Sequence, residues 1–260
     1  MTLHYTMPNA REGVPELIKR LKLGQPYKVD GRMTYEARGA IVTIEDPIDS
    51  LPVDIGIRLD ISSIVREYLD LINGSSLVGQ RIRYQLDEIE KLIITRPDTR
   101  DALVVVPDPQ YDRTMPERSA TVQPLIGYHF IYRKPAIDLH VYLRESDVMA
   151  HFIGQLFVAG QLLATMVNAI NAPEIGSVTF HIGSLYLLSA DTSITDYIKE
   201  PKVPEKRDAS LPTGIEGANW EEVVQRAQWL TELIDNGVTD DDRKRFTSSE
   251  RWFVDTVSPA

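Results

Sequence analysis

Hydrophobic and polar residues recur along this chain with two different periods, which predicts a mixture of helices and strands. A period near 3.6 residues, typical of an amphipathic helix, fits several segments. The predicted helices cover residues 12–23, 60–72, 86–95, 151–171 and 219–235. Glycine at position 74 and the Pro97-Asp98 pair lie just beyond two of these segments, where helices commonly end.

Runs rich in β-branched and aromatic residues predict strands between these helices. They cover residues 40–44, 102–106, 124–133, 137–144 and 177–189. The Lys134-Pro135 pair predicts a tight turn between two of them. Because the order shows no βαβ rhythm, we expect an α+β fold around one sheet. A charged, proline-containing connector at residues 199–208 then separates a main domain, residues 1–198, from a C-terminal extension, residues 199–260, whose single amphipathic helix packs on the same domain.

The composition excludes several kinds of chemistry. The 260 residues include no cysteine, which removes disulfides, cysteine-bound metals and every thiol nucleophile. The formal net charge of −10 makes the chain a poor candidate for binding nucleic acid polymers or anionic membranes, which need cationic surface. A local basic pocket for a small anion stays compatible with this charge.

We expect no membrane span, because the most apolar run, residues 152–170, contains Gln155, Gln161 and Asn168 and suits a buried helix. The first eleven residues lack the charged and apolar regions of a signal peptide, which favours a cytoplasmic protein. The five histidines include no helical His-x-x-x-His pair, so we interpret them as structural and expect no metal. Phosphate-binding glycine loops and nucleophile elbows are likewise missing from the sequence.

Arginines near strand ends are the clearest candidates for binding an anion. Arg100 precedes one predicted strand and Arg144 ends another, and a guanidinium group can form paired hydrogen bonds with a phosphate. The alternative is that Arg144 forms a surface ion pair with Glu145 or Asp147. Glu67, between apolar residues of a predicted helix, is either a partly buried acid with a raised pKa or an ordinary residue at the edge of that helix.

Four segments then form a recognisable series. They are Ile64-Val65-Arg66-Glu67-Tyr68-Leu69 with Asn73-Gly74, Arg96-Pro97-Asp98-Thr99-Arg100-Asp101 with the strand after it, Val141-Tyr142-Leu143-Arg144-Glu145-Ser146-Asp147, and the segment from Ser177 through Gly183-Ser184-Leu185-Tyr186. In this order they resemble motifs of the thymidylate synthase and pyrimidine-nucleotide hydroxymethylase superfamily. The resemblance extends over about residues 17–191. It implies a single α+β domain with a large twisted mixed sheet, flanked by helices and paired back to back in a homodimer.

The resemblance also implies roles for individual residues. Arg144 matches a phosphate-binding arginine, and Arg100 matches an arginine that reaches the same phosphate across the dimer. Glu67 matches a glutamate that organises water and protons around the pyrimidine ring and Asp147 an aspartate near the base, which makes these two the expected catalytic residues, with Glu67 as acid or base. Gln155 stands where the family reads the edge of that base. Tyr186 stands at a sugar-binding position, while Arg32 or Arg38 matches an early phosphate-loop arginine. The implied partners are a nucleoside monophosphate and, as one-carbon donor, methylenetetrahydrofolate.

The chain departs from the family pattern at several of these positions. Pro124 occupies the place of the nucleophilic cysteine, and proline cannot form the covalent adduct that activates the base. Asp101 replaces a second phosphate-binding arginine, and Tyr186 and Leu188 replace a His and Tyr pair that holds the sugar. Gln155 is one methylene longer than the family's Asn or Asp.

Three interpretations follow. The first is a divergent enzyme that transfers a hydroxymethyl or methyl group to a nucleotide base by a cysteine-independent route. The second is a catalytically inactive homologue that acts as a nucleotide sensor or as the partner subunit of an enzyme. The third is a related scaffold whose pocket takes an unrelated ligand or is filled by side chains.

Overall fold

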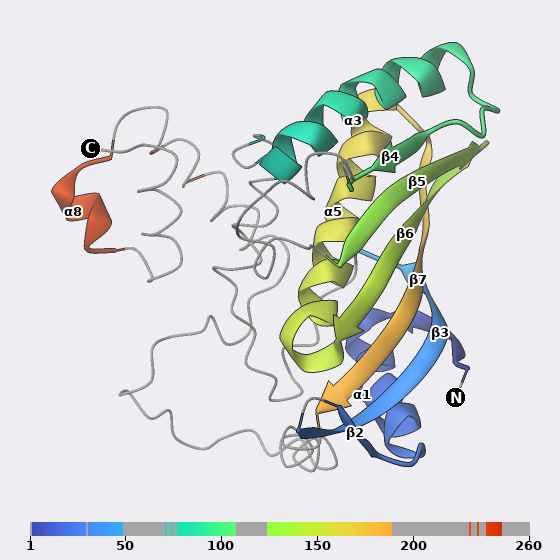
Figure 1. Cartoon of the computed structure of the whole chain (residues 1–260). Coiled ribbons are helices and arrows are strands. Elements are labelled where there is room, and N and C mark those ends of the chain that lie inside the picture. The colour runs from blue at the N-terminus through green and yellow to red at the C-terminus, as the bar shows by residue number, and fades with distance from the viewer. Residues whose placement is uncertain are drawn as a thin grey trace.

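One large mixed sheet organises the part of the chain that the structure describes. The computed structural model describes residues 2–29, 31–48, 71, 74, 77–107, 124–188, 229, 233 and 238–245. Seven strands lie in the order β1-β3-β7-β6-β5-β4, with β2 pairing to β3 (Figure 1). The strands are β1 (His4–Asn9), β2 (Tyr27–Val29), β3 (Arg32–Asp46), β4 (Leu103–Val105), β5 (Leu125–Arg133), β6 (Ala136–Asp147) and β7 (Glu174–Leu188). The predicted sheet flanked by helices is confirmed.

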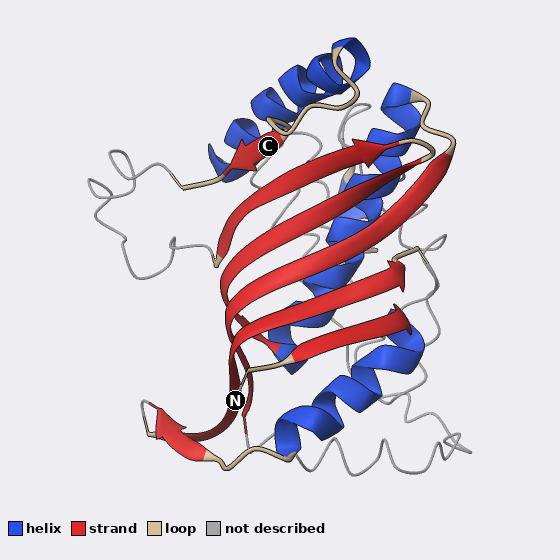
Figure 2. Cartoon of the chain, turned by 90° about the vertical axis from the view of Figure 1, so that its right-hand side faces the viewer, coloured by secondary structure: helices blue, strands red, loops and turns tan. Residues whose placement is uncertain are grey.

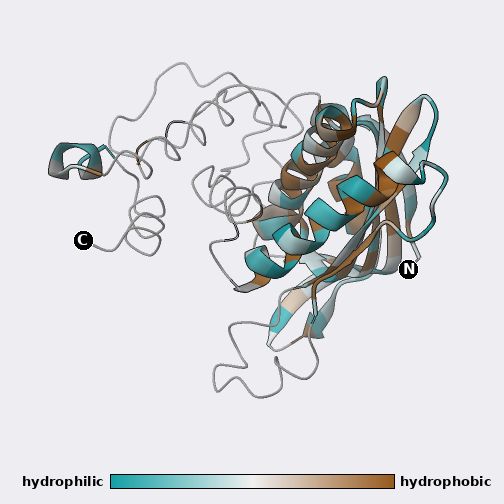
Figure 3. Cartoon of the chain, turned by 90° about the horizontal axis from the view of Figure 1, so that it is seen from above, coloured by the Kyte–Doolittle hydropathy of each residue, from teal (hydrophilic) through white to brown (hydrophobic). Residues whose placement is uncertain are grey.

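Helices cover one face of this sheet (Figure 2). They are α1 (Ala10–Lys22), α3 (Leu77–Thr95) and α5 (Ile153–Ile170), and α5 follows the π-helical turn η2 (Val148–Phe152). A short helix, α8 (Asp240–Arg243), lies near the C-terminus. The core fills the layer between helices and sheet, where Phe130, Phe152 and Phe180 are fully buried, and Figure 3 shows hydrophobic residues along this layer. No described helix covers the opposite face of the sheet.

The predicted helix at residues 12–23 begins two residues earlier than expected, because Asn9 caps it. The Asn9 side chain accepts a hydrogen bond from the backbone N–H of Glu12 at 2.8 Å, which satisfies a donor that the first turn leaves free. Basic residues in the last turn oppose the negative end of the helix dipole. The apolar face of α1 buries Val14 and Leu17 against the sheet.

Helix α3 closes one edge of the sheet. The Gln85 side chain donates from Nε2 to the carbonyl of Val105 at 2.9 Å and accepts from the Val105 N–H at 2.9 Å. This amide therefore takes the place of a neighbouring strand beside β4 and satisfies backbone groups that would otherwise be open to pairing with another chain. The helix is nine residues longer at its N-terminal end than the predicted segment 86–95, and it ends, as predicted, before Pro97.

The central unit is the crossover from β6 through η2 and α5 to β7. Strands β6 and β7 are parallel neighbours, as are β1 and β3, so the fold contains βαβ connections that the sequence pattern did not indicate. The predicted strands 124–133 and 137–144 and the turn at Lys134-Pro135 are confirmed as an antiparallel hairpin. Helix α5 is buried along most of its length. It ends at Asn171, whose positive φ of 53° gives a left-handed C-cap.

The alternation of buried residues shifts at a row that crosses β3, β7 and β6. Successive buried residues are three positions apart instead of two at Ala37 and Ala40 of β3 and at Ile182 and Leu185 of β7. Both strands therefore change, at the same level, which side chains face the helices. Gly39 lies in this row with φ 64°, and Gly183 lies opposite Arg144. This row separates the middle of the uncovered face from the end of the sheet where β6 and β7 finish.

Substitution of Gly183 by alanine is expected to destabilise the protein by about 1–3 kcal/mol, the range for overpacking a tight site. A Cβ atom at this position would lie 2.5 Å from the carbonyl oxygen of Arg144, which is backbone and cannot rotate away. Urea denaturation measures the change. Gly39→Ala is the matched control, because no atom lies within 4 Å of its Cβ and only its positive φ opposes the substitution. A loss for Gly183→Ala no larger than for the control would contradict the close approach.

Two predicted helices, residues 60–72 and 219–235, lie largely outside the described residues. Leu71, Trp229 and Leu233 are described, and all three are helical and pack with the core. Among the described residues, the helical stretch Val148–Ile170 is long and apolar enough to cross a membrane by length and composition alone, and 67% of its 18-residue window is buried within the protein. That burial is typical of the core helix of a soluble fold.

Candidate site at the end of the sheet

Residues from four distant segments meet where β6 and β7 end and β3 and β5 begin. Asp147 on β6 is paired in register with Tyr186 on β7, and Tyr186 is paired with Glu36 on β3. Pro124, just before β5, accepts a hydrogen bond through its carbonyl from the N–H of Arg144 at 2.7 Å. Pro124, which stands where the resemblance places the nucleophile, therefore lies directly beside Arg144, which the resemblance assigns to phosphate binding.

Arg144 is half-exposed and ion-paired. Its Nη2 lies 2.5 Å from Oε1 of Glu145, and the two side chains are 50% and 45% exposed. This is the alternative surface ion pair that the sequence left open, formed with Glu145 rather than Asp147. Because the pair is exposed to solvent, it contributes little to stability, and a phosphate could replace the carboxylate at modest cost.

Asp147 is buried and terminates the strand by capping the helical segment that follows. Its Oδ1 accepts from the N–H groups of Met149 at 2.9 Å and Ala150 at 3.1 Å, which are free donors at the start of η2. The neighbouring Ser146 donates from its hydroxyl to Oε1 of Gln155 at 2.7 Å. Two of the sequence-assigned residues, Asp147 and Gln155, therefore hold the junction between β6 and α5.

Asp147→Ala is expected to destabilise the protein by about 0.5–2 kcal/mol through loss of this cap. Asp147→Asn is the matched control, because its amide oxygen can accept the same hydrogen bonds. The midpoint of chemical denaturation distinguishes the two variants. Equal losses of stability in the two variants would mean that Asp147 stabilises the protein through its negative charge and not through these hydrogen bonds.

Tyr186 is half-buried among charged groups. Burial raises the pKa of its hydroxyl, and the nearby carboxylates of Asp147 and Glu145 raise it further, while the positive charge of Arg32 lowers it. Burial and the carboxylates prevail, so this hydroxyl stays protonated at neutral pH and can donate a hydrogen bond. The effect of Arg32 on Tyr186 also places this arginine, the first residue of β3, at the same end of the sheet.

Glu36 is a member of this site that the sequence did not single out. Its side chain is only 11% exposed, and its carboxylate accepts hydrogen bonds from Ser184 Oγ and, at 2.9 Å, from Arg38 Nε. Arg38, the alternative to Arg32 for an early phosphate ligand, is thus engaged by Glu36. The alternation Glu36-x-Arg38, typical of the polar face of a strand, could have identified Glu36. These residues lay outside the predicted strand at residues 40–44.

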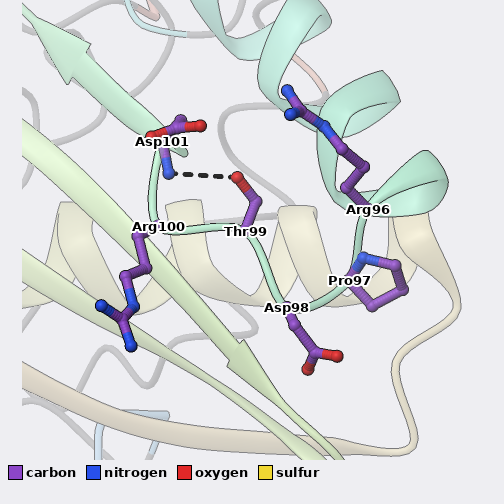
Figure 4. Close-up of a pocket in the computed structure, with 6 residues that line it drawn as sticks. All are labelled: Arg96, Pro97, Asp98, Thr99, Arg100 and Asp101. Atoms are coloured by element: carbon purple, nitrogen blue, oxygen red, sulfur yellow. Dashed lines mark hydrogen bonds between the residues drawn. The ribbon is translucent and has the colours of Figure 1, made fainter.

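Arg100 lies elsewhere. It belongs to the loop between α3 and β4, and its carbonyl contacts Nε2 of His129 at 3.1 Å. His129 is paired with His140, and Arg144 lies four positions farther along β6, which is about 13 Å at the rise of a strand. The Arg100 loop, residues 96–101, lines an open hollow of about 550 Å³. The side chains of Arg96 and Arg100 point in different directions from this loop (Figure 4). Within one protomer, no described contact brings Arg100 and Arg144 together.

Glu67 lies outside the described residues, so its predicted role stays a prediction. In the described ranges no group of three or more histidines and carboxylates could hold a metal ion. A scan against models of known protein families finds no match for this chain, and a search of curated proteins finds none either. The geometry of the chain itself is therefore what supports a function.

Proposed function

We propose that this chain binds a nucleoside 5′-monophosphate as a homodimer of the thymidylate synthase type and transfers a one-carbon unit to its base without a cysteine. One observation carries the proposal. Arg144 lies beside Pro124, and Tyr186 lies near Arg32 farther toward the same end of the sheet, while Gln155 meets this end from the helix side through Ser146. Pro124 and Arg144 belong to one hairpin, so the informative neighbours are Tyr186 and Arg32, which β7 and β3 bring from elsewhere in the chain.

Different described side chains suit the phosphate, the sugar and the base of a nucleotide. Arg144 supplies a fixed positive charge for the phosphate and would exchange its contact with Glu145 for the ligand. The protonated hydroxyl of Tyr186 supplies a donor for a sugar oxygen. Gln155, which the resemblance assigns to the edge of the base, accepts a hydrogen bond from Ser146 at the junction of β6 and α5 and would have to reach the base from the helix side.

Arg100 completes the phosphate site only from a second protomer. The uncovered face of the sheet extends from the Arg100 loop to the site, and a two-fold axis near the middle of that face exchanges its two ends. Pairing two such faces brings Arg100 of one protomer toward Arg144 of the other. The back-to-back dimer is thus part of the proposal, because the phosphate site needs both arginines.

The ordinary covalent route of the superfamily does not fit these residues, since Pro124 has no group that can attack the base. Methylenetetrahydrofolate is the one-carbon co-substrate that the resemblance implies, and no described residue is assigned to it. What the chain can supply at this site is binding, orientation and a proton held on Tyr186. Activation of the base must then come from a group other than a thiol.

The substitution at Pro124 also favours a second function, that of an inactive homologue serving as a nucleotide sensor or partner subunit. Loss of a covalent nucleophile removes most of an enzyme's rate while leaving binding residues in place. Turnover by the pure homodimer would exclude this alternative. Binding without turnover, together with co-purification of a homologue that carries the cysteine, would favour it.

Calorimetric titration with a panel of ribo- and deoxyribonucleoside monophosphates tests the proposal. The expected result is saturable binding of at least one pyrimidine monophosphate and much weaker binding of its nucleoside, because the phosphate contact is lost. Absence of binding by every member of the panel at millimolar concentration would contradict both functions.

A further inference from the structure

A row of aromatic side chains crosses the uncovered face of the sheet, and we call it the histidine ladder: His129, His140, His181 and Tyr142. Nδ1 of His140 lies 2.9 Å from Nε2 of His181, so the two imidazoles share one hydrogen bond. Their rings are stacked with centroids 5.3 Å apart, and Tyr142 stacks on His181 at 4.8 Å. His129 continues the row at 6.3 Å from His140.

Few charged groups face the His140–His181 pair. From β6, Asp138 is the nearest carboxylate, and its Oδ1 already accepts hydrogen bonds from the backbone and side chain of Ser177. From β5 the facing group is His129, with the Arg100 loop behind it. Strand β3 places Ile41 opposite His181, and farther along β6 Arg144 is paired with Glu145. Among the described residues, little negative charge is therefore available to hold added protons.

The geometry of the pair opposes double protonation. A neutral pair shares one proton between Nδ1 and Nε2, whereas two imidazolium rings would direct N–H groups at each other across 2.9 Å. Burial lowers the pKa of both histidines, and for His140 the neighbouring His181 and His129 lower it further, against a smaller opposing effect of Asp138. These shifts already hold in the single chain, so further burial of the pair by a second chain would lower both pKa values further and make proton binding harder still.

Apolar side chains beside the ladder indicate that this face is covered in the working protein. Leu103 and Val105 on β4 and Ile126 on β5, the strand of His129, are 45%, 48% and 46% exposed. A face with a neutral, aromatic centre and an apolar flank is complementary to itself around a two-fold axis. The proposed phosphate site takes Arg100 from one protomer and Arg144 from the other, which makes a second copy of this chain the occupant of this face.

We propose that the His140–His181 pair makes this self-association pH-sensitive, so that acidification separates the protomers and withdraws Arg100 from the partner's site. The inference rests on the proposed function, since the dimer is part of it. When the faces pair, the ladder loses its remaining water and protonated imidazole becomes harder to accommodate. Dissociation therefore takes up protons, and the dissociation constant rises as the pH falls.

The linkage fixes the expected size of the effect. Each proton taken up on dissociation raises the dissociation constant about tenfold per pH unit between the pKa of the dimer and that of the monomer. A symmetric dimer carries two ladders. Uptake of one proton across one pH unit below the lowered pKa of the monomer makes the dimer about tenfold weaker, and we expect this weakening between pH 8 and pH 5. The site would then lose nucleotide affinity in parallel, since it would lack one arginine.

Sedimentation velocity of the full chain over a concentration series at pH 8 and pH 5 tests the proposal. The designed variant is His140→Asn with His181→Gln, whose amide nitrogens and oxygens occupy the places of Nδ1 and Nε2 but do not titrate. His151→Gln, on an exposed position of η2, is the matched control. Circular dichroism at both pH values establishes that each protein is folded, and either single substitution replaces the double variant if the double variant does not fold.

The expected result is a dimer that weakens at pH 5 in the parent and in His151→Gln but not in the ladder variant. A parent dimer with the same dissociation constant at both pH values would overturn the switch and leave the proposed dimer intact. Equal weakening in the ladder variant would also overturn it, because the titrating group would then lie elsewhere. A folded monomer at both pH values would instead contradict the dimer of the proposed function.

Discussion

Replacing Arg144 by alanine is expected to weaken nucleoside monophosphate binding by about 10- to 150-fold, because a hydrogen bond to a charged group contributes about 1.5–3 kcal/mol. Arg144 is half-exposed, and its carboxylate partner Glu145 is a side chain that a phosphate can displace. The substitution removes the guanidinium group assigned to the phosphate beside Pro124 and leaves Arg32 as the other candidate within the protomer, so the loss appears for nucleotides and not for nucleosides.

Two further variants make the Arg144 result specific. Arg144→Lys keeps the charge but loses the planar pair of donors, so its affinity is expected to fall between those of the parent and the alanine variant. Arg133→Ala removes an arginine at the far end of β5 that bonds the carbonyl of Tyr132, and its affinity should equal that of the parent. Calorimetric titration with the best ligand of the panel measures all three. Parent-like affinity of Arg144→Ala would show that the phosphate lies elsewhere.

Replacing Phe180 by alanine is expected to cost about 3–5 kcal/mol of unfolding free energy, the usual loss for a buried aromatic ring. The Phe180 side chain is fully buried on the helix-facing side of β7, and its ring packs edge-on against Phe152 of η2 with centroids 5.2 Å apart. The substitution opens a cavity where the central strand meets the start of the core helix. A loss of this size is a large part of the stability of a typical domain.

The matched control for Phe180 is its neighbour in the chain. Thr179 points to the uncovered face, where its hydroxyl is 3.1 Å from that of Thr43. Thr179→Ala should cost only about 0.5–1.5 kcal/mol, the contribution of one hydrogen bond. Urea denaturation compares the two variants. Equal losses would mean that the two faces of β7 do not differ as the structure describes.

Local patterns in the sequence predicted the elements whose stability is local. The apolar spacing of α1, α3 and α5, the prolines that follow α3 and form the β5–β6 turn, and the β-branched run of β7 all act within a few residues. The sequence underestimated β3 and missed β1, because polar residues on an uncovered face break the expected pattern. It also gave no sign of η2, whose start depends on the single side chain of Asp147.

The long-range partners in this sheet were not predicted from the sequence. Tyr186 meets Asp147 across a parallel strand pair, and Ser184 meets Glu36 across 148 positions of sequence. No local period encodes such pairings, since register depends on which strands become neighbours. The His140–His181 contact is of the same kind, 41 positions apart, and the sequence could suggest only that each histidine was structural.

Calorimetry on mixed dimers decides whether the two arginines act together across protomers. Arg100→Ala and Arg144→Ala chains carrying different affinity tags are co-expressed, and the heterodimer is purified through both tags. If Arg100 completes the partner's site, each homodimer binds nucleotide weakly, whereas the heterodimer recovers parent affinity at one site per dimer. A heterodimer that binds as weakly as both homodimers, or an Arg100→Ala homodimer that binds as tightly as the parent, would contradict a phosphate site shared between protomers.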